Sequence, residues 1–196
     1  SRSNFAAFDL KTNKLLKGFD GTSNSVMALA ATNERVYVGG GFSKAAGQSR
    51  SNLAAYLANG KLDTKWKADV TGPRGSRVAA LTVASKQNNL IIAGAFTQIA
   101  GSTYLSSGAV KLDTAKKVKW ASQSSSYPIR MQISKPAPGK ELTYSSMGFT
   151  SASYDGKQAY LTAFSYLQGA TGSGTFEGRA AVNPSNGAIL WRNACK

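Results

Sequence analysis

The sequence predicts an all-β chain built from a repeated four-stranded unit. Short signatures recur at a nearly fixed spacing: VMAL at 26–29 returns as VAAL at 78–81, GGF at 40–42 returns as GAF at 94–96, and Trp66 returns as Trp120. Each repeat holds four short β-rich runs separated by turn residues. No stretch keeps the apolar spacing of an amphipathic helix over three turns. A period near 50 residues with four strands is typical of β-propeller blades, so we expect blade-like repeats.

The unit at residues 26–66 shows all four strands most clearly. Val26–Ala30 and Arg35–Gly39 are two β-rich runs joined by a polar turn. Asn52–Leu57 and Lys61–Trp66 follow, and the Asn-Gly dipeptide between them is a strong hairpin signal. This unit therefore serves as the template for the others.

The template assigns the rest of the chain. The Ser-Arg-Ser-Asn sequence at 1–4 returns at 49–52, which makes the first residues the outer half of a blade. We expect an outer half-blade at 1–20, blades at 26–66, 78–120 and 149–191, and an inserted loop rich in Pro and Ser at 121–148. Three and a half blades are fewer than the four to eight that close a propeller, so we expect an incomplete ring. The chain is then a fragment, a processed piece or one part of an assembly that completes the ring.

The composition of the 196-residue chain favours an acidic partner. Lys and Arg number 24 against nine carboxylates, which gives a net charge of +15. Such a surplus attracts nucleic acid, anionic lipid headgroups and phosphate-bearing cell-wall polymers. The absence of a basic groove interleaved with aromatic residues argues against nucleic acid. The apolar runs are too short for a membrane span.

Catalytic motifs are missing from the sequence. Histidine is absent, which removes the usual nucleophilic triads and the commonest metal ligand. Most carboxylates fall at predicted turns, and Asp9 and Asp113 fill one repeat position that Asn183 fills in the last unit. We interpret that position as a side chain that binds its own turn. We therefore predict no catalytic residues, no metal ligands and no cofactor.

Lysines on the predicted outer hairpins are the candidate binding residues. They recur around the outer strands of successive units, and the candidates there are Lys61, Lys65, Lys67, Lys116, Lys117 and Lys119. Lysine on an outermost strand also prevents edge-to-edge aggregation, and this structural interpretation is the stronger of the two. Arg50 is a further candidate because it precedes a strand in a loop between repeats, although an arginine that binds loop carbonyls explains it better.

The closing half-unit resembles the blades of a known class. The sequence AVNPSNGAILW at 181–191 is similar to the outer strands of quinoprotein-type (PQQ-like) propeller blades, and FDLKTNKLL at 8–16 is a weaker copy. Gly-x-Phe followed by Arg-x-Asn-Leu-Ala is similar to repeats of secreted bacterial propellers. The resemblance implies the fold and an extracellular or cell-surface location. The quinoprotein cofactor site, with its adjacent Cys-Cys pair and metal-binding acidic set, has no counterpart in this sequence.

Three functional hypotheses remain open. The leading one is a non-enzymatic, secreted or surface-associated binding scaffold for an anionic polymer or a protein partner. The second is a carbohydrate-active enzyme with carboxylates brought together at the propeller axis. The third is a purely structural part of a larger propeller, whose partner is the missing remainder or another chain. Cys195, the single cysteine, is either a free thiol or half of a bridge to such a partner.

Overall fold

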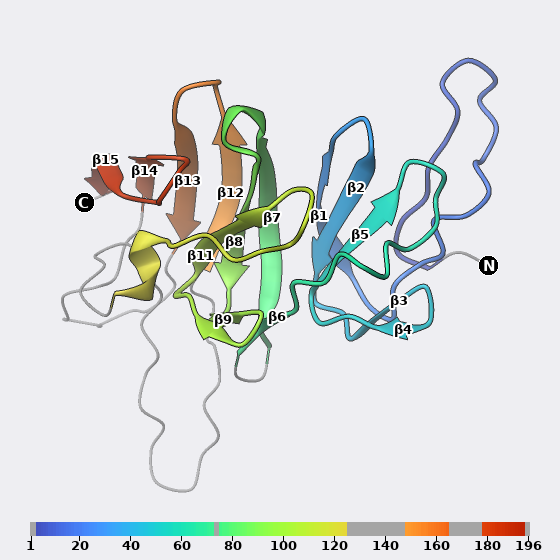
Figure 1. Cartoon of the computed structure of the whole chain (residues 1–196), viewed down its shortest axis with the longest axis horizontal. Coiled ribbons are helices and arrows are strands. Elements are labelled where there is room, and N and C mark those ends of the chain that lie inside the picture. Colours follow the sequence, from blue (N-terminus) through green and yellow to red (C-terminus); the bar gives the residue numbers. More distant parts are fainter. Residues whose placement is uncertain (1–2, 73–74, 125–147, 165–177, 195–196) are drawn as a thin grey trace, which may run out of the picture.

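The computed structural model describes residues 3–72, 75–124, 148–164 and 178–194. Its described part is all-β, as predicted, and consists of small antiparallel sheets with two short 3-10 segments. Three main sheets follow one another in chain order between the N-terminal and C-terminal ends (Figure 1). These sheets do not form a closed ring.

The first sheet contains β1 (Val26–Ala31), β2 (Arg35–Gly40) and β5 (Leu53–Leu57) in that order. The second contains β7 (Arg77–Ala84), β8 (Asn89–Ala95) and β11 (Ser107–Lys111), with η1 (Ser85–Gln87) at its first turn. The third contains β12 (Gly148–Tyr154), β13 (Ala159–Phe164), β14 (Gly178–Val182) and β15 (Ile189–Ala194). Because β7 lies between β1 and β12, the innermost strands of the three sheets are neighbours.

The outermost strand differs between the units. In the third sheet β15 is a full strand, whereas the predicted outer strands of the earlier units are reduced to single bridges. These bridges join Phe8 to Leu15, Tyr56 to Leu62 and Val110 to Lys117. In the first sheet the side chain of Asp63 explains the early end, because Oδ1 accepts the backbone N–H groups of Lys65 and Trp66 and turns the chain away.

Two short hairpins lie between the second and third main strands of the first two sheets. They are β3 (Lys44–Ala45) with β4 (Gln48–Ser49), and β9 (Gln98–Ile99) with β10 (Ser102–Thr103). Both turn through an Ala-Gly pair at positive φ, 46° and 75° in each case. A two-residue turn with both residues at positive φ matches the right-handed twist of the strands that it joins. The Ala-Gly pair recurs at a spacing of 54, which is the sequence signal for these hairpins.

The linker before each of the first two sheets pairs with one strand of these hairpins. β6 (Val70–Thr71) pairs with β9, and Thr22 forms the equivalent bridge to Ala45. Each linker thus joins the outer edge of one unit to a hairpin of the next. After β11 the chain continues into η2 (Ala121–Gln123). Most of the predicted insertion at 121–148, namely residues 125–147, lies outside the described residues.

The core fills the space between successive sheets, and aromatic residues at the ends of the outer segments reach into it. Phe19, Trp66 and Trp120 are buried, and each contacts the outer hairpin of the next unit. A methyl group added at Gly60 would touch Phe19, and one added at Gly187 would touch the Trp120 ring. These three aromatic residues therefore pack between neighbouring units. Trp191 differs, because 41% of it is exposed.

The backbone hydrogen bonds of the outer turns show which residues of the repeats are equivalent, and they differ from the sequence assignment at one position. The N–H of Asp9 binds the carbonyl of Lys14, Lys111 binds Lys116 in the same way, and Asn183 binds Ala188. Asp9 and Asn183 therefore share one position, but Lys111 fills it in the second unit. Asp113 lies two residues further along, so its assignment to that position was wrong.

Candidate functional site

The candidate lysines lie on the outer hairpins of the first two sheets. Lys61 and Lys116 are equivalent by backbone geometry, because their carbonyls accept the turn hydrogen bonds from Leu57 and Lys111. Lys65 and Lys119 each directly precede a buried tryptophan. All four side chains are exposed, and none forms an ion pair with another described residue. Two adjacent units therefore present the same pair of unpaired cations.

The other two candidate lysines have partners within the molecule. The ammonium group of Lys67 lies 3.2 Å from a carboxylate oxygen of Asp69. Lys117 donates to the hydroxyl of Ser102 at 2.6 Å. Both side chains are exposed, but their charges are less available to a ligand than those of the four unpaired lysines.

Arg50, the remaining candidate, is buried, with only 4% of it exposed. Its guanidinium donates to the carbonyl of Ser49 at 2.8 Å and reaches the carbonyls of Asp63 and Thr64 at 3.5 Å. Its Nε has no hydrogen-bond partner among the described residues. This geometry favours the structural interpretation, in which Arg50 fixes the segment that leads to Trp66.

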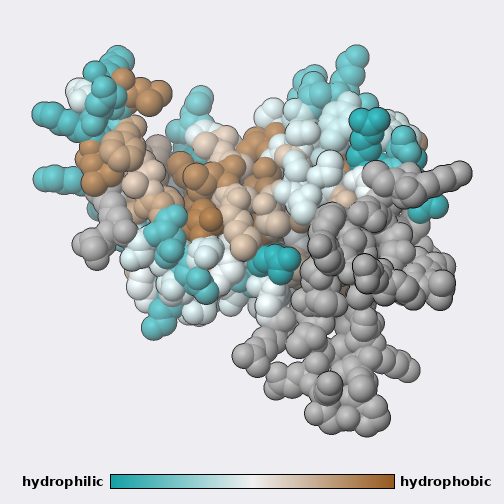
Figure 2. Space-filling view, turned by 180° about the vertical axis from the view of Figure 1, so that it is seen from behind, coloured by the Kyte–Doolittle hydropathy of each residue, from teal (hydrophilic) through white to brown (hydrophobic). Residues whose placement is uncertain are grey.

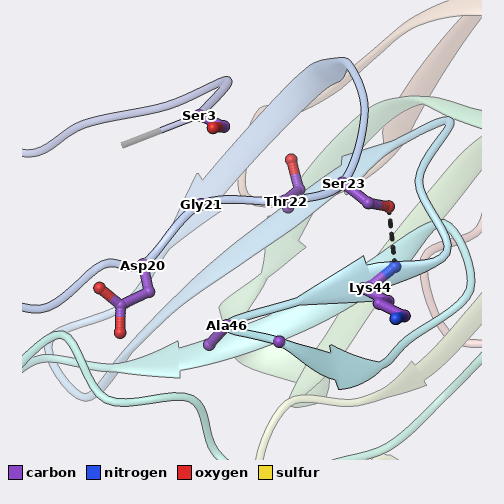
Figure 3. Close-up of a pocket in the computed structure, with 8 residues that line it drawn as sticks. Ser3, Asp20, Gly21, Thr22, Ser23, Lys44 and Ala46 are labelled. Atoms are coloured by element: carbon purple, nitrogen blue, oxygen red, sulfur yellow. Dashed lines mark hydrogen bonds between the residues drawn. The ribbon is translucent and has the colours of Figure 1, made fainter. Parts of the chain in front are cut away.

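A surface hollow of about 460 Å³ lies between the linker at 20–23 and the β3–β4 hairpin. Figure 3 shows Asp20 and Lys44 at opposite ends of the labelled residues, with Ser3, Thr22 and Ser23 between them. The hydroxyl of Thr22 donates to the carbonyl of Asn24 at 2.6 Å, and Ser23 Oγ accepts the N–H of Lys44 at 3.0 Å. The Ser23 hydroxyl thus holds the linker on the hairpin, whereas the Thr22 hydroxyl binds within the linker.

The fold and the repeated geometry agree with one family comparison. Residues 33–65 match the family model of a domain of unknown function (DUF5122), a β-propeller. The matched range runs from the turn before β2 to the end of the outer segment beyond β5. A comparison with curated proteins gave no match. The chain thus contains β-propeller repeats, and residues 33–65 overlap the unit that the sequence indicated most clearly.

The described carboxylates of this propeller chain are mostly engaged by their own loops. Asp9 Oδ1 accepts the N–H groups of Lys11 and Thr12, and Asp155 Oδ1 accepts those of Lys157 and Gln158. These backbone hydrogen bonds lower the pKa of both carboxyl groups. A general acid at neutral pH needs the opposite shift. The two carboxyl groups are therefore suited to stabilise turns.

Asp63 is the carboxylate with the strongest ionic partner. Its partial burial is the largest single effect and acts to raise the pKa, but the hydrogen bond from Arg35 Nε, at 2.9 Å, the backbone hydrogen bonds from Trp66 and Lys65 and the charge of Arg35 together lower the pKa. No group of three or more Cys, Asp or Glu residues that could hold a metal occurs in the part of the chain that the structure describes. Within the same ranges, no helix has the length and apolar character needed to cross a membrane.

The sequence interpretation missed a tyrosine that joins neighbouring blades. Tyr37 is completely buried, and its hydroxyl donates to the carbonyl of Leu112 in the next sheet at 2.8 Å. Trp66 Nε1 donates to the neighbouring carbonyl of Lys111 at 3.3 Å. The Tyr37 and Trp66 rings pack with their centroids 5.3 Å apart. Trp66 was visible as a repeated residue, but the tyrosine could not be found from spacing because Ile91 replaces it in the second unit.

Proposed function

We propose that this β-propeller chain is a non-enzymatic binding scaffold, secreted or at the cell surface, that holds an anionic polymer along its outer hairpins. The observation that carries the proposal is the pair Lys61 and Lys65, which is repeated one unit further as Lys116 and Lys119. All four are exposed and make no ion pair among the described residues. The similarity of the repeats to secreted bacterial propellers supports the location.

A polymer suits this arrangement better than a small anion. The cations stand on separate units rather than in one enclosed pocket, so a single small ligand cannot bridge them. A chain with regularly spaced negative charges gains a contact at each unit and releases bound counterions as it binds. The net charge of +15 adds long-range attraction to every such contact.

Inorganic polyphosphate is a suitable probe, with neutral dextran as the control polymer. We expect the logarithm of the affinity for polyphosphate to fall linearly with the logarithm of the salt concentration, and dextran not to bind. The double variant Lys65→Gln/Lys119→Gln should bind more weakly. Its salt slope should be shallower by about 1 to 2, because each lost phosphate contact removes up to about one unit.

The matched control is Lys86→Gln/Lys157→Gln, which removes the same charge from exposed lysines at the first turns of the second and third sheets. It should retain most of the affinity, since only the long-range part of the attraction changes. Isothermal calorimetry at several salt concentrations measures both quantities. An affinity that does not change with salt, or an equal loss in the two double variants, would contradict the proposal.

A further inference from the structure

Another hollow lies between the first sheet and the linker that leads to the second, at the end of the sheets where β3, β4, β6 and β9 lie (Figure 1). It measures about 590 Å³, a size typical of small-molecule sites. Its walls come from the linker before β1, the turn after β2, the residues before β5 and the linker between β6 and β7. Loops that rigid sheets hold in place in this way are common positions for binding residues.

The walls of this hollow are polar but uncharged. Every described residue that lines it is a serine, threonine, asparagine, glycine or phenylalanine, in a chain with a net charge of +15. Figure 2 shows pale side chains of intermediate hydropathy and hydrophilic ones along the lower edge of the N-terminal half, below the apolar side chains of the same face. Because such a wall gives a phosphate or a carboxylate no charged partner, the hollow suits an uncharged ligand that forms hydrogen bonds.

Two asparagine side chains in the wall leave opposite halves of their amides free. Nδ2 of Asn52 donates to the carbonyl of Val70 at 2.8 Å and to the hydroxyl of Ser76 at 3.2 Å, whereas its Oδ1 accepts no hydrogen bond from a described residue. Asn24 shows the reverse, because its Oδ1 accepts the N–H of Ser25 at 2.8 Å and its Nδ2 donates to no described residue. Asn52 is only 7% exposed, so its unused acceptor belongs to a largely buried side chain. The hollow therefore offers one amide acceptor and one amide donor.

Serine hydroxyls accompany these two amides. The backbone N–H of Ser51 donates to Asp69, but its hydroxyl makes no hydrogen bond to a described residue. The hydroxyl of Ser76 accepts from Asn52 and keeps its own hydrogen for a further acceptor. Phe42 is the one apolar side chain larger than a methyl group among the described residues of the wall, and only 3% of it is exposed. The hollow thus suits a ligand with several hydroxyl groups better than one with large apolar groups.

We propose that this hollow binds a neutral sugar that carries an acetamido group. The N–H of that group donates to Oδ1 of Asn52, its carbonyl accepts from Nδ2 of Asn24, and the ring hydroxyls bind the serines. A glucose unit has one hydroxyl oxygen in place of two separate polar atoms, so it leaves part of the asparagine pair unmatched, and such a mismatch weakens binding. A peptide supplies amides but no ring hydroxyls. The site contains none of the candidate lysines, so the inference does not depend on polymer binding.

Isothermal calorimetry with uncharged probes of similar size tests the proposal. The trimer of N-acetylglucosamine carries acetamido groups and hydroxyls, cellotriose carries hydroxyls alone, and N-acetyl-triglycine amide carries amides alone. We expect the first to bind, and the other two to bind about tenfold more weakly or not at all, because each lacks one set of hydrogen bonds. The affinity for the trimer should not change with salt, unlike binding to lysines. Failure of the trimer to bind, equal affinity for either of the other probes, or an affinity that falls with salt would overturn the proposal.

Two exposed polar groups give matched variants. Asn24→Asp keeps the acceptor for Ser25 but replaces the free donor with a carboxylate oxygen, so it should weaken binding of the trimer about tenfold or more. Ser51→Ala removes a hydroxyl that no described residue binds, and should weaken binding about threefold to tenfold. Ser49→Ala is the control, because Ser49 is exposed and does not line the hollow. It should bind the trimer like the wild type.

A filled hollow gives the strongest effect. Gly41 lines the hollow without a positive φ, and an added Cβ would meet only the Cβ of Arg77, at 4.0 Å. Gly41→Leu should therefore fold and lose binding of the trimer, with urea denaturation as the check on folding. A folded Gly41→Leu variant that binds like the wild type, an Asn24→Asp variant with unchanged affinity, or a Ser49→Ala variant that loses as much as Ser51→Ala would each overturn the proposal.

Discussion

The side-chain amide of Asn52 donates a hydrogen bond of 2.8 Å to the carbonyl oxygen of Val70, eighteen residues further along the chain. Asn4 makes the same bond to the carbonyl of Thr22, at 2.7 Å and at the same spacing. Both asparagines have positive φ, 61° and 76°, a conformation that asparagine tolerates better than most residues. The repeated Ser-Arg-Ser-Asn sequence therefore ends in a clamp that ties an outer hairpin to the linker before the next sheet.

Substitutions at Asn52 should separate the contribution of its hydrogen bond from that of its tolerance of positive φ. Asn52→Ala removes the bond and places a residue with Cβ at positive φ, so we expect a loss of about 3 kcal/mol in the free energy of unfolding. Asn52→Gly removes the bond but fits the backbone, and should cost about 1 to 2 kcal/mol. Urea denaturation measures both. Equal losses in the two variants would show that the positive φ contributes nothing to the choice of asparagine.

The contact between Trp120 and Gly187 predicts a second pair of effects. Gly187 and Gly47 have nearly the same positive φ, 72° and 75°. An added Cβ would collide with the Trp120 ring at Gly187, but would meet nothing within 4 Å at Gly47. Gly47→Ala should therefore cost about 1 kcal/mol from backbone strain alone. Gly187→Ala should cost about 2 to 4 kcal/mol, because the buried tryptophan must move as well.

Thermal and urea unfolding of these two variants gives the comparison directly. Tryptophan fluorescence should also change in Gly187→Ala, since the surroundings of Trp120 change, and should stay as in the wild type in Gly47→Ala. Equal destabilisation of the two variants would mean that the outer turn yields to the added methyl group, and that the Trp120 contact does not require glycine.

The sequence contained enough information for the all-β architecture, because the repeated apolar runs and turn residues act locally. Asn59-Gly60 marked a hairpin turn that the structure shows, with Gly60 at a φ of 83°. The lengths of the outer strands could not be predicted in this way. Residues 61–66 have the composition of a strand, but Asp63 binds Arg35 and the backbone of Lys65 and Trp66, and this tertiary network ends the pairing.

The candidate site was predictable only as a pattern of charge. The recurrence of lysines after the outer turns is visible in the sequence, and the structure places Lys61 and Lys116 at equivalent backbone positions. Whether a given lysine is free depends on neighbours that spacing does not reveal, such as Asp69 beside Lys67 and Ser102 beside Lys117. Trp191 is 41% exposed and lies within β15, two residues after Ile189, whereas Trp66 lies four residues after Leu62 and leaves the sheet, and sequence spacing did not reveal this difference.

Arg35 pairs with two carboxylates, Asp63 and Glu34, and we expect their substitutions to lower the free energy of unfolding by different amounts. Asp63→Ala leaves a mostly buried guanidinium and two backbone N–H groups without their acceptor, so we expect a loss of about 3 kcal/mol. Glu34 also pairs with Arg35, at 3.1 Å, but its side chain is 79% exposed. Glu34→Ala should therefore cost no more than about 1 kcal/mol. Urea denaturation at neutral pH measures both, and similar losses would contradict the assigned role of Asp63.

The last prediction concerns the pH dependence of the turn before β13. The backbone N–H of Gln158, the Tyr160 hydroxyl and the N–H of Lys157 all donate to Asp155 and lower the pKa of its carboxyl group to about 2. A carboxyl whose pKa is lower in the folded state stabilises the fold above its usual pKa near about 4, and loses this contribution as the pH falls toward 2. Tyr160→Phe removes one donor, so the pKa of Asp155 should rise. Carbon-13 NMR of the carboxyl carbon measures the titration directly.

Tyr154→Phe is the matched control, because that hydroxyl binds Gln87 and should leave the pKa of Asp155 unchanged. An unchanged pKa in Tyr160→Phe would show that the backbone donors alone hold the carboxylate.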